Sequence, residues 1–270
     1  MKLTLLIPII LTSITITSLQ AEIAVKNGEK IAFLGDSITQ GGWSNPVGYV
    51  RLVMAGLEAN GVHAEAVPAG ISGHKSDQML ARLETDVLSK KPQWMTLSCG
   101  VNDVWHGAKG VPLDDEMAKT GYDATVAARG TYKKNITEIL EKASAAGIKP
   151  VVLTATVISE KLDSKENTAL APYNDFLRQT AKEKNLPLAD LNAMFQKHIK
   201  AANQPDKKIY TVDGVHMNTE GNKLMATGVL QALGLNLAQI GKAKASWETL
   251  TKAAEELKAK AAAKKKAAKP

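Results

Sequence analysis

The sequence lacks three features that would indicate a cofactor or a cross-linked protein. It has one cysteine, Cys99, which excludes an intrachain disulfide, and its place at the end of an expected strand is typical of a small buried hydrophobe. The histidines and acidic residues are not spaced like metal ligands. The glycines near the N-terminus are not followed by the Lys-Ser/Thr pair of a phosphate-binding loop. We therefore expect the protein to act without a metal or any other cofactor.

Net charge is also missing from most of the chain. The formal charge is +7 at pH 7, but nine lysines and three glutamates between Gly241 and Pro270 account for +6, and Lys2 accounts for +1. Residues 22–240 therefore carry no net charge. Because nucleic-acid binding depends on clustered lysine and arginine near the site, we expect no nucleic-acid partner.

The basic segment 241–270 is low in complexity and rich in alanine, lysine and glutamate. This composition favours a helix, but the few apolar side chains predict that its far end is frayed or disordered. Two interpretations stay open. The tail either contacts an anionic surface, such as polysaccharide, lipid headgroups or an acidic protein, or it is a solvated extension without a partner.

The first 21 residues predict a secretory signal peptide. They contain one positive charge at Lys2, an apolar stretch from Leu3 to Ile16 and a small residue at Ala21. Leu19 is large for the position three residues before cleavage. A proline and several threonines argue against an uncleaved anchor, since a spanning helix needs ~20 mainly apolar residues. We therefore expect a secreted or periplasmic protein.

Strand-like and helix-like segments alternate between these two ends. Such βαβ repetition predicts a mainly parallel sheet with helices on both faces. We expect one α/β domain over residues 22–240, a three-layer α/β/α, flavodoxin-like fold with five strands. The expected strands are Lys30–Leu34, Val62–Val67, Trp94–Ser98, Pro150–Val157 and Leu186–Ala189, and the expected helices are Tyr49–Ala59, Lys75–Leu83, Asp123–Ala146, Ala169–Lys184, Leu191–Ala202 and Glu220–Ala232.

A serine follows the first expected strand directly. Gly35-Asp36-Ser37 breaks the buried run at the carboxyl end of the strand, which is where open α/β sheets place ligands. A serine hydroxyl at that position is a candidate nucleophile, but it needs a base within hydrogen-bond reach. The alternative is that Ser37 only caps the following helix. Asp36 is expected to brace the turn.

The candidate base lies near the end of the domain, in the string Asp213-Gly214-Val215-His216. An imidazole can take the serine proton and return it to the leaving group when an acceptor holds its other nitrogen. A spacing of three residues lets the Asp213 carboxylate fold back onto the His216 ring. The alternative is an Asp-Gly turn followed by an exposed histidine. Asn218 or Thr219 is expected to begin the next helix.

Two further segments offer hydrogen-bond donors for a developing oxyanion. Asn102 follows the strand Trp94–Ser98, and its amide would project from the same edge of the sheet. Loss of one such donor costs ~10²- to 10³-fold in rate. Gly73 lies in a glycine-containing segment after the strand Val62–Val67, where the backbone can approach a substrate closely. The alternative for Asn102 is a turn-forming role.

With these four motifs in this order, the chain from about Lys30 to Leu233 resembles the SGNH, or GDSL-type, hydrolase family. The resemblance implies that Ser37 is the nucleophile, His216 the base and Asp213 its partner. It also implies that the backbone N–H groups of Ser37 and Gly73 and the Asn102 amide form the oxyanion hole. One departure is Pro68, at a position where relatives often have asparagine.

The sequence thus predicts a serine ester hydrolase with an acyl-enzyme mechanism. The export signal and the aromatic residues near the site resemble the branch of the family that removes acetyl groups from carbohydrates. Two alternatives stay open: a lipid esterase of the lysophospholipase or thioesterase type, and a non-catalytic carbohydrate-binding or adhesion protein on the same scaffold. The side chains expected to contact the substrate are Trp43, His74, Trp105 and His106, with packing or solvent exposure as the alternative for each.

Overall fold

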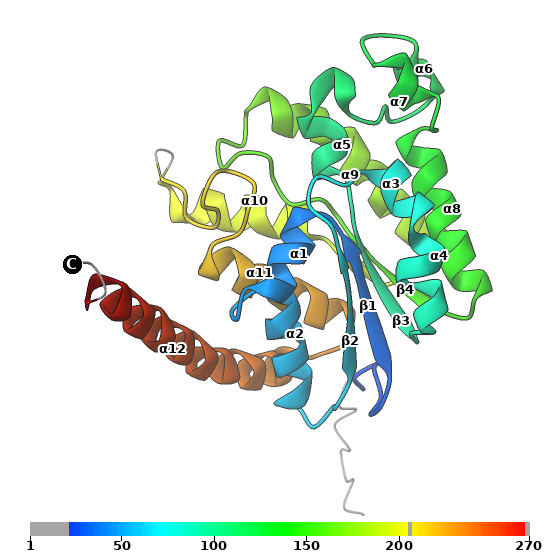
Figure 1. Cartoon of the computed structure of the whole chain (residues 1–270). Coiled ribbons are helices and arrows are strands. Elements are labelled where there is room, and N and C mark those ends of the chain that lie inside the picture. The colour runs from blue at the N-terminus through cyan, green and yellow to red at the C-terminus, as the bar shows by residue number, and fades with distance from the viewer. Residues whose placement is uncertain (1–21, 205–206, 268–270) are drawn as a thin grey trace, which may run out of the picture.

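A computed structural model describes residues 22–204 and 207–267, with side chains up to residue 261. The predicted signal peptide lies outside the described residues. Five parallel strands form one sheet in the order β2-β1-β3-β4-β5 (Figure 1). The strands are β1 (Lys30–Gly35), β2 (Glu65–Gly70), β3 (Trp94–Ser98), β4 (Lys149–Leu153) and β5 (Leu188–Ala189). The predicted α/β fold is therefore confirmed.

Helices cover both faces of the sheet. Figure 1 places α1, α2 and α11 on one side and α3, α4 and α8 on the other. The helices are α1 (Ser37–Ser44), α2 (Tyr49–Glu58), α3 (Ser76–Ala81), α4 (Leu83–Asp86), α5 (Val101–Trp105), α6 (Asp115–Ala118), α7 (Ala124–Ala127), α8 (Tyr132–Ala145), α9 (Lys165–Glu183), α10 (Leu191–Ala202), α11 (Thr219–Ala232) and α12 (Leu237–Ala267), with 3₁₀ turns η1 (Leu88–Lys90) and η2 (Gly107–Lys109).

The central strands are buried because helices cover both of their faces. Every residue of β3 is buried, as is every residue of β1 after Lys30. Buried strands in which apolar residues predominate are typical of parallel sheets between two helical layers. Pro68 lies in β2, at the edge of the sheet, where a missing backbone N–H is tolerated.

Several element boundaries differ from the sequence prediction. The second strand is Glu65–Gly70 because its register follows β1, from the Lys30–Glu65 pair to the Gly35–Gly70 pair. The strand expected over Pro150–Val157 ends at Leu153. Beyond that point the carbonyls of Ala155 and Thr156 accept hydrogen bonds from side-chain amides of α9 and α10, which replace a strand partner.

Two expected helices also have different limits. The helix predicted over residues 123–146 is divided into α7 and α8, because Gly130 has a positive φ of 101° that ends the first segment. Helix α9 starts at Lys165, earlier than expected, since the Ser164 side chain accepts a hydrogen bond from the Asn167 N–H and caps the helix. Asn218 caps α11 as predicted.

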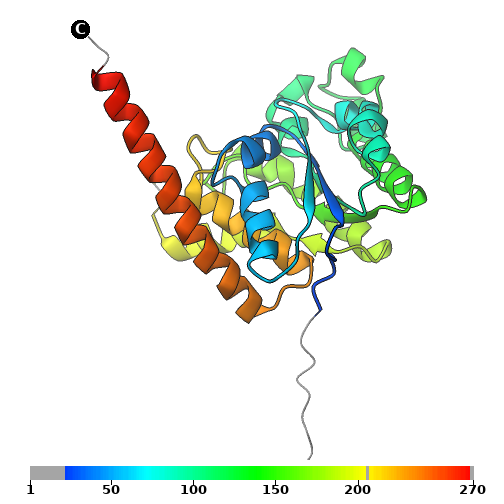
Figure 2. The same cartoon turned by 60° about the horizontal axis from the view of Figure 1, so that its bottom comes forward.

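The basic segment is part of one long helix. Helix α12 begins at Leu237, and Figure 2 shows it projecting beyond the rest of the molecule. Its first half packs on α2 and α11. The side chain of Trp247 is fully buried there, and its ring N–H donates to the Leu52 carbonyl at 2.7 Å. Further along, Leu257 is 63% exposed.

Of the helices that the structure describes, none has a stretch long and apolar enough to cross a membrane.

Candidate active site

Ser37 is the first residue of α1, directly after β1. The preceding residue, Asp36, caps this helix: its side chain accepts a hydrogen bond from the Ile38 N–H at 2.9 Å. Capping is therefore the task of Asp36, and the alternative that Ser37 serves as the cap is wrong. The Ser37 side chain is half-buried at the carboxyl end of the sheet. A side chain at Gly35 would meet the Thr39 hydroxyl at 2.0 Å, so glycine permits this tight turn.

A chain of two hydrogen bonds joins Ser37 to His216 and Asp213. The Ser37 Oγ lies 2.9 Å from His216 Nε2, and His216 Nδ1 lies 2.6 Å from Asp213 Oδ2. With Nδ1 protonated and held by the carboxylate, Nε2 is free to accept the serine proton. The structure thus brings together three residues predicted from the sequence, although 179 positions separate Ser37 from His216.

The Asp213 carboxylate is held ionised by its surroundings. Burial acts to raise the pKa of Asp213, but hydrogen bonds from the His216 ring and from the backbone N–H groups of His216 and Val215 outweigh it and lower the pKa to about 2. The two backbone bonds, to Oδ1, are 2.7 and 2.9 Å long. The carboxylate therefore stays negative over the pH range in which a histidine acts as a base.

Gly73 and Asn102 lie in two segments that are distant in sequence but adjacent in space. The Asn102 side chain is buried, and its amide nitrogen donates to the His74 carbonyl at 3.2 Å. An amide has two N–H donors, so within the described part of the chain one remains for a substrate oxygen. Gly73 is exposed in a turn with a φ of 77°, a conformation that favours glycine.

A buried aspartate connects these two segments. The Asp103 Oδ1 accepts hydrogen bonds from the Ser76 N–H at 3.0 Å and from the Ser76 hydroxyl at 2.6 Å. Asp103 therefore fixes α5, which carries Asn102, to the first turn of α3, which follows Gly73. The sequence does not predict this role of Asp103, because nothing in its local sequence indicates a contact 27 residues away.

Two carboxyl groups below the site have raised pKa values. Burial raises the pKa of Asp36 to about 7; the Ile38 N–H bond opposes this shift, and the charge of Asp103 adds to it. Burial also raises the pKa of Asp103 to about 6, against the hydrogen bonds from Ser76. Neither side chain is more than 2% exposed. Both groups therefore titrate near neutral pH rather than near their ordinary value of 3.8.

Three of the four expected substrate contacts lie in the segments that contain Gly73 and Asn102, and one of them meets His216. Trp105 is 46% exposed, and its ring meets the His216 ring edge-on with 6.3 Å between centroids. His106 is exposed beside Trp105. His74 follows Gly73, and its Nδ1 accepts from the Arg82 Nε–H at 3.1 Å. Burial and the charge of Arg82 lower the pKa of His74, which favours the neutral ring.

Trp43 lies elsewhere, at the far end of α1 from Ser37. The Arg51 guanidinium lies over its indole ring, 3.6 Å from the centroid. Both residues line a hollow of about 690 Å³, together with side chains from α2, β2 and α12. Trp43 is therefore separated from the other three expected substrate contacts.

Across the described residues, no three His, Cys, Asp or Glu side chains are grouped so that they could hold a metal ion.

Acetylxylan esterases are among the known proteins with similar sequences and structures. The acetylxylan esterase of Geobacillus stearothermophilus is 29% identical over 235 residues, covering 78% of this chain and 96% of that protein. The uncharacterized lipoprotein YqeF of Bacillus subtilis is 23% identical over 186 residues, covering 60% of this chain and 70% of YqeF. The crystal structure of the acetyl xylan esterase AlAXEase is similar with a TM-score of 0.63 and 33% identity, covering 75% of this chain and 98% of that one.

The model of the GDSL-like lipase/acylhydrolase family matches residues 33–224, a range that begins within β1 and ends within α11. This range contains Ser37, His216 and Asp213, which are joined by hydrogen bonds, as well as Gly73 and Asn102. The chain therefore belongs to the GDSL-like lipase/acylhydrolase family and is a carboxylic ester hydrolase.

Proposed function

We propose that this protein removes acetyl groups from carbohydrate through an acyl-enzyme formed on Ser37. The observation that carries the proposal is the hydrogen-bonded chain Ser37 Oγ–His216 Nε2–Asp213, with distances of 2.9 and 2.6 Å. This arrangement supplies a nucleophile, a base and an acceptor that orients the base. Membership of an acylhydrolase family gives the same class of reaction.

In the proposed reaction, His216 Nε2 takes the proton of the Ser37 hydroxyl while the oxygen attacks the ester carbonyl. The backbone N–H groups of Ser37 and Gly73 and the free N–H of Asn102 stabilise the negative oxygen of the tetrahedral intermediate. His216 then gives the proton to the alcohol oxygen, and the carbon–oxygen bond breaks. A water molecule, deprotonated by His216, then attacks the acetyl-serine carbonyl; the bond to Ser37 Oγ breaks, His216 returns the proton to that oxygen, and acetate leaves.

Two observations support a short acyl group on a sugar. The relatives with the highest similarity reported above are acetylxylan esterases. In addition, three residues of the candidate site are open to solvent: Gly73, Trp105 and His106 are all exposed. An exposed indole beside the base can stack on a sugar ring that carries the ester. A long acyl chain would instead need an apolar groove that removes it from water.

The test compares rates on p-nitrophenyl acetate and p-nitrophenyl octanoate, together with acetate release from acetylated xylo-oligosaccharides. We expect kcat/KM to be higher for the acetate ester, and Ser37→Ala to lose nearly all activity, about 10⁴-fold or more. A preference for the octanoate ester would instead support the lipid esterase interpretation. Unchanged hydrolysis by Ser37→Ala would remove Ser37 from the mechanism.

We also propose that the protein is exported, with cleavage after Ala21. The support is the charge and hydropathy pattern of the first 21 residues. The relative YqeF is described as a lipoprotein. The single cysteine of this chain, Cys99, is buried after β3, so no cysteine lies at the predicted cleavage site to carry a lipid. N-terminal sequencing of protein recovered from outside the cytoplasm tests the proposal, and an intact Met1 there would contradict it.

A further inference from the structure

Glu160 is a buried carboxylate that holds the segment leading to Asp213 and His216. It lies in the connection after β4 and is 8% exposed. Its Oε2 accepts from the Ile209 N–H at 2.7 Å. Its Oε1 accepts from the Tyr210 N–H at 2.9 Å, the Thr211 N–H at 2.7 Å and the Thr211 hydroxyl at 2.6 Å. One side chain thus fixes three successive backbone positions.

The contacts continue from this segment into the loop of the proposed base. The Thr211 hydroxyl, which donates to Glu160, accepts a hydrogen bond from the Gly214 N–H at 3.1 Å. The Val212 N–H donates to the His216 carbonyl at 2.8 Å. Two hydrogen bonds therefore link the segment held by Glu160 to the loop of Asp213 and His216.

The segment that carries Glu160 also packs against the loop from behind. Gly214 has a φ of 107°, and a Cβ added there would lie 3.3 Å from the Ile158 carbonyl oxygen and 3.6 Å from the Cα of Ser159. The turn at Gly214 thus lies directly against residues 158–160. The space between the two segments would hardly accept a methyl group, so a large shift of either segment would press on the other.

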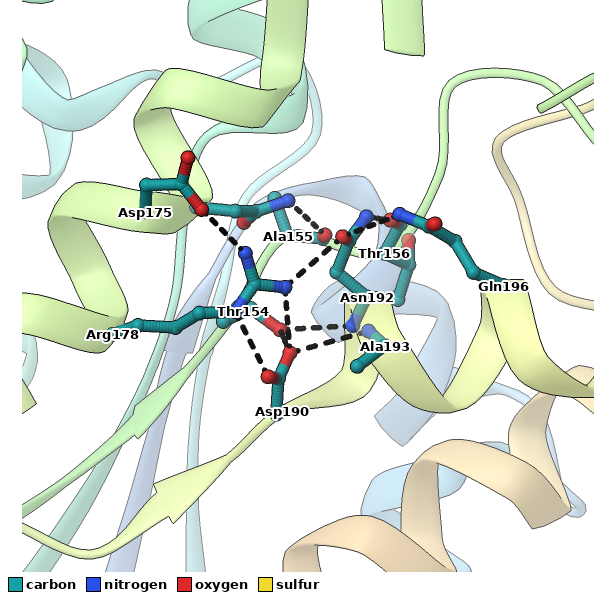
Figure 3. A network of polar contacts seen from close by, with 10 residues as sticks. Thr154, Ala155, Thr156, Asp175, Arg178, Asp190, Asn192, Ala193 and Gln196 are labelled. Atoms are coloured by element: carbon teal, nitrogen blue, oxygen red, sulfur yellow. Dashed lines mark hydrogen bonds and ion pairs between the residues drawn. The ribbon is translucent and has the colours of Figure 1, made fainter. Parts of the chain in front are cut away.

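Glu160 is itself held by rigid neighbours. The Asn167 side chain accepts from the Ile158 N–H at 3.0 Å and donates to the carbonyls of Ser159 at 2.8 Å and Lys161 at 3.0 Å. A second network fixes residues 154–156, just before this segment (Figure 3). In that network Asp190 and Asn192 bond to Thr154, and the Asn192 side chain donates to the Thr156 carbonyl.

We propose that Glu160 is a positioning residue for the acid–base loop: it holds residues 209–211 so that Asp213 and His216 stay aligned with Ser37. The inference rests on the proposed function of these three residues. In the described part of the chain Glu160 accepts four hydrogen bonds, three of them from successive backbone N–H groups, so loss of this acceptor would leave those groups without a partner. A misplacement of about 1 Å can cost ~10²-fold in rate.

The first test is Glu160→Gln. The amide is nearly isosteric, but its NH₂ group would face backbone N–H donors that need an acceptor. We expect kcat for p-nitrophenyl acetate to fall about 10- to 100-fold, with a KM change below about threefold, because substrate contacts are untouched. In the wild-type protein, the distance of 2.6 Å between His216 Nδ1 and Asp213 Oδ2 predicts a low-field proton NMR resonance for the Nδ1–H. We expect this resonance to be lost or broadened in Glu160→Gln.

The matched control is Glu29→Gln, since Glu29 also accepts a backbone N–H and a side-chain donor. It bonds to the Lys26 N–H and the Trp94 ring N–H, each at 2.8 Å, before the start of β1. We expect wild-type kcat and an unchanged resonance. A second pair of variants changes less of the side chain: Thr211→Val removes the hydroxyl between Glu160 and Gly214 and should lower kcat, whereas Thr211→Ser keeps it and should retain wild-type kcat.

A folded Glu160→Gln protein with wild-type kcat and the wild-type resonance would overturn the inference. If Glu160→Gln fails to unfold cooperatively on heating, Thr211→Val decides, and wild-type kcat with an unchanged resonance in that variant would overturn it. If the wild-type protein hydrolyses no ester, the proposed function fails. The resonance needs no substrate, so its loss in Glu160→Gln would still support the positioning role, and its persistence would still overturn it.

Discussion

The acidic residues of the site divide into two groups with opposite electrostatic properties. Asp213 is hydrogen-bonded to His216 and has a pKa lowered to about 2. Asp36 and Asp103 are buried beneath the site, and their pKa values are raised to about 7 and about 6. The ordinary pKa of all three side chains is 3.8. Burial and hydrogen bonding therefore separate the pKa values of chemically identical groups by several pH units.

Replacement of Asp36 by asparagine should stabilise the protein more at pH 8 than at pH 5. The pKa of Asp36 is raised in the folded state. Between pH 3.8 and about 7, Asp36 is therefore protonated in the folded protein but ionised in the unfolded chain. Wild-type stability from this group is therefore full below pH 3.8 and falls as pH rises to about 7. An asparagine side chain at this position keeps the bond from the Ile38 N–H without the buried charge.

The measurement is the free energy of unfolding in urea at both pH values. We expect the difference between D36N and wild type to grow by on the order of 1–2 kcal/mol from pH 5 to pH 8. Asp213 does not contribute to this change, since its lowered pKa makes it lose stability only below its ordinary value of 3.8. A constant difference between the two proteins would contradict the burial of an ionised Asp36.

At the scale of elements, the sequence predicted the limits of some strands and helices closely and missed those of others. The runs Lys30–Leu34 and Trp94–Ser98, in which apolar residues predominate, are strands at almost those limits. The helical break at Gly130 and the early start of α9 depend on one φ angle and one cap, which periodicity does not detect. Ser37, Asp213 and His216 were recognisable from motifs. Glu160 was not, because its partners lie 49–51 residues away.

A second contact between distant elements sets the start of α2. Its N-cap, Gly48, has no side chain to offer, and the buried Asn222 of α11 accepts the Tyr49 N–H at 2.8 Å instead. The same amide donates to the carbonyls of Met217 and Asn218. Asn222 therefore joins α2 to the segment just after His216.

We expect Asn222→Ala to lower the free energy of unfolding by about 1–3 kcal/mol, because it leaves buried backbone groups without partners. Gln231→Ala, an exposed position on the same helix, is the matched control and should change stability by less than about 0.5 kcal/mol. Chemical denaturation of both variants is the measurement. Equal stability of the two would mean that the Asn222 bonds contribute nothing.

At the scale of the whole molecule, α12 has a packed half and a projecting half (Figure 2). Ala243 and Trp247 are fully buried and Ala254 is 6% exposed, whereas Leu257 is largely exposed. The first half is therefore part of the domain, even though its sequence resembles the basic tail. Contact of the projecting half with an anionic surface stays a prediction.

Two truncations separate these halves. Removal of residues 258–270 should leave the melting temperature within about 2 °C of wild type, because the side chains described there, those of residues 258–261, are exposed. Removal of residues 242–270 deletes Trp247, whose loss alone is expected to cost about 3–5 kcal/mol. Thermal unfolding with activity at 25 °C tests both. An unchanged melting temperature after the longer truncation would show that α12 does not support the domain.

The contact between Ser37 and His216 spans 179 residues, and this separation has a consequence for synthesis. A chain made from its N-terminus displays the serine 179 residues before the histidine is added. Over that interval the nascent chain has an unactivated hydroxyl. Ester hydrolysis becomes possible only when the chain has folded far enough to bring His216 to Ser37. Ester cleavage therefore reports on the finished fold.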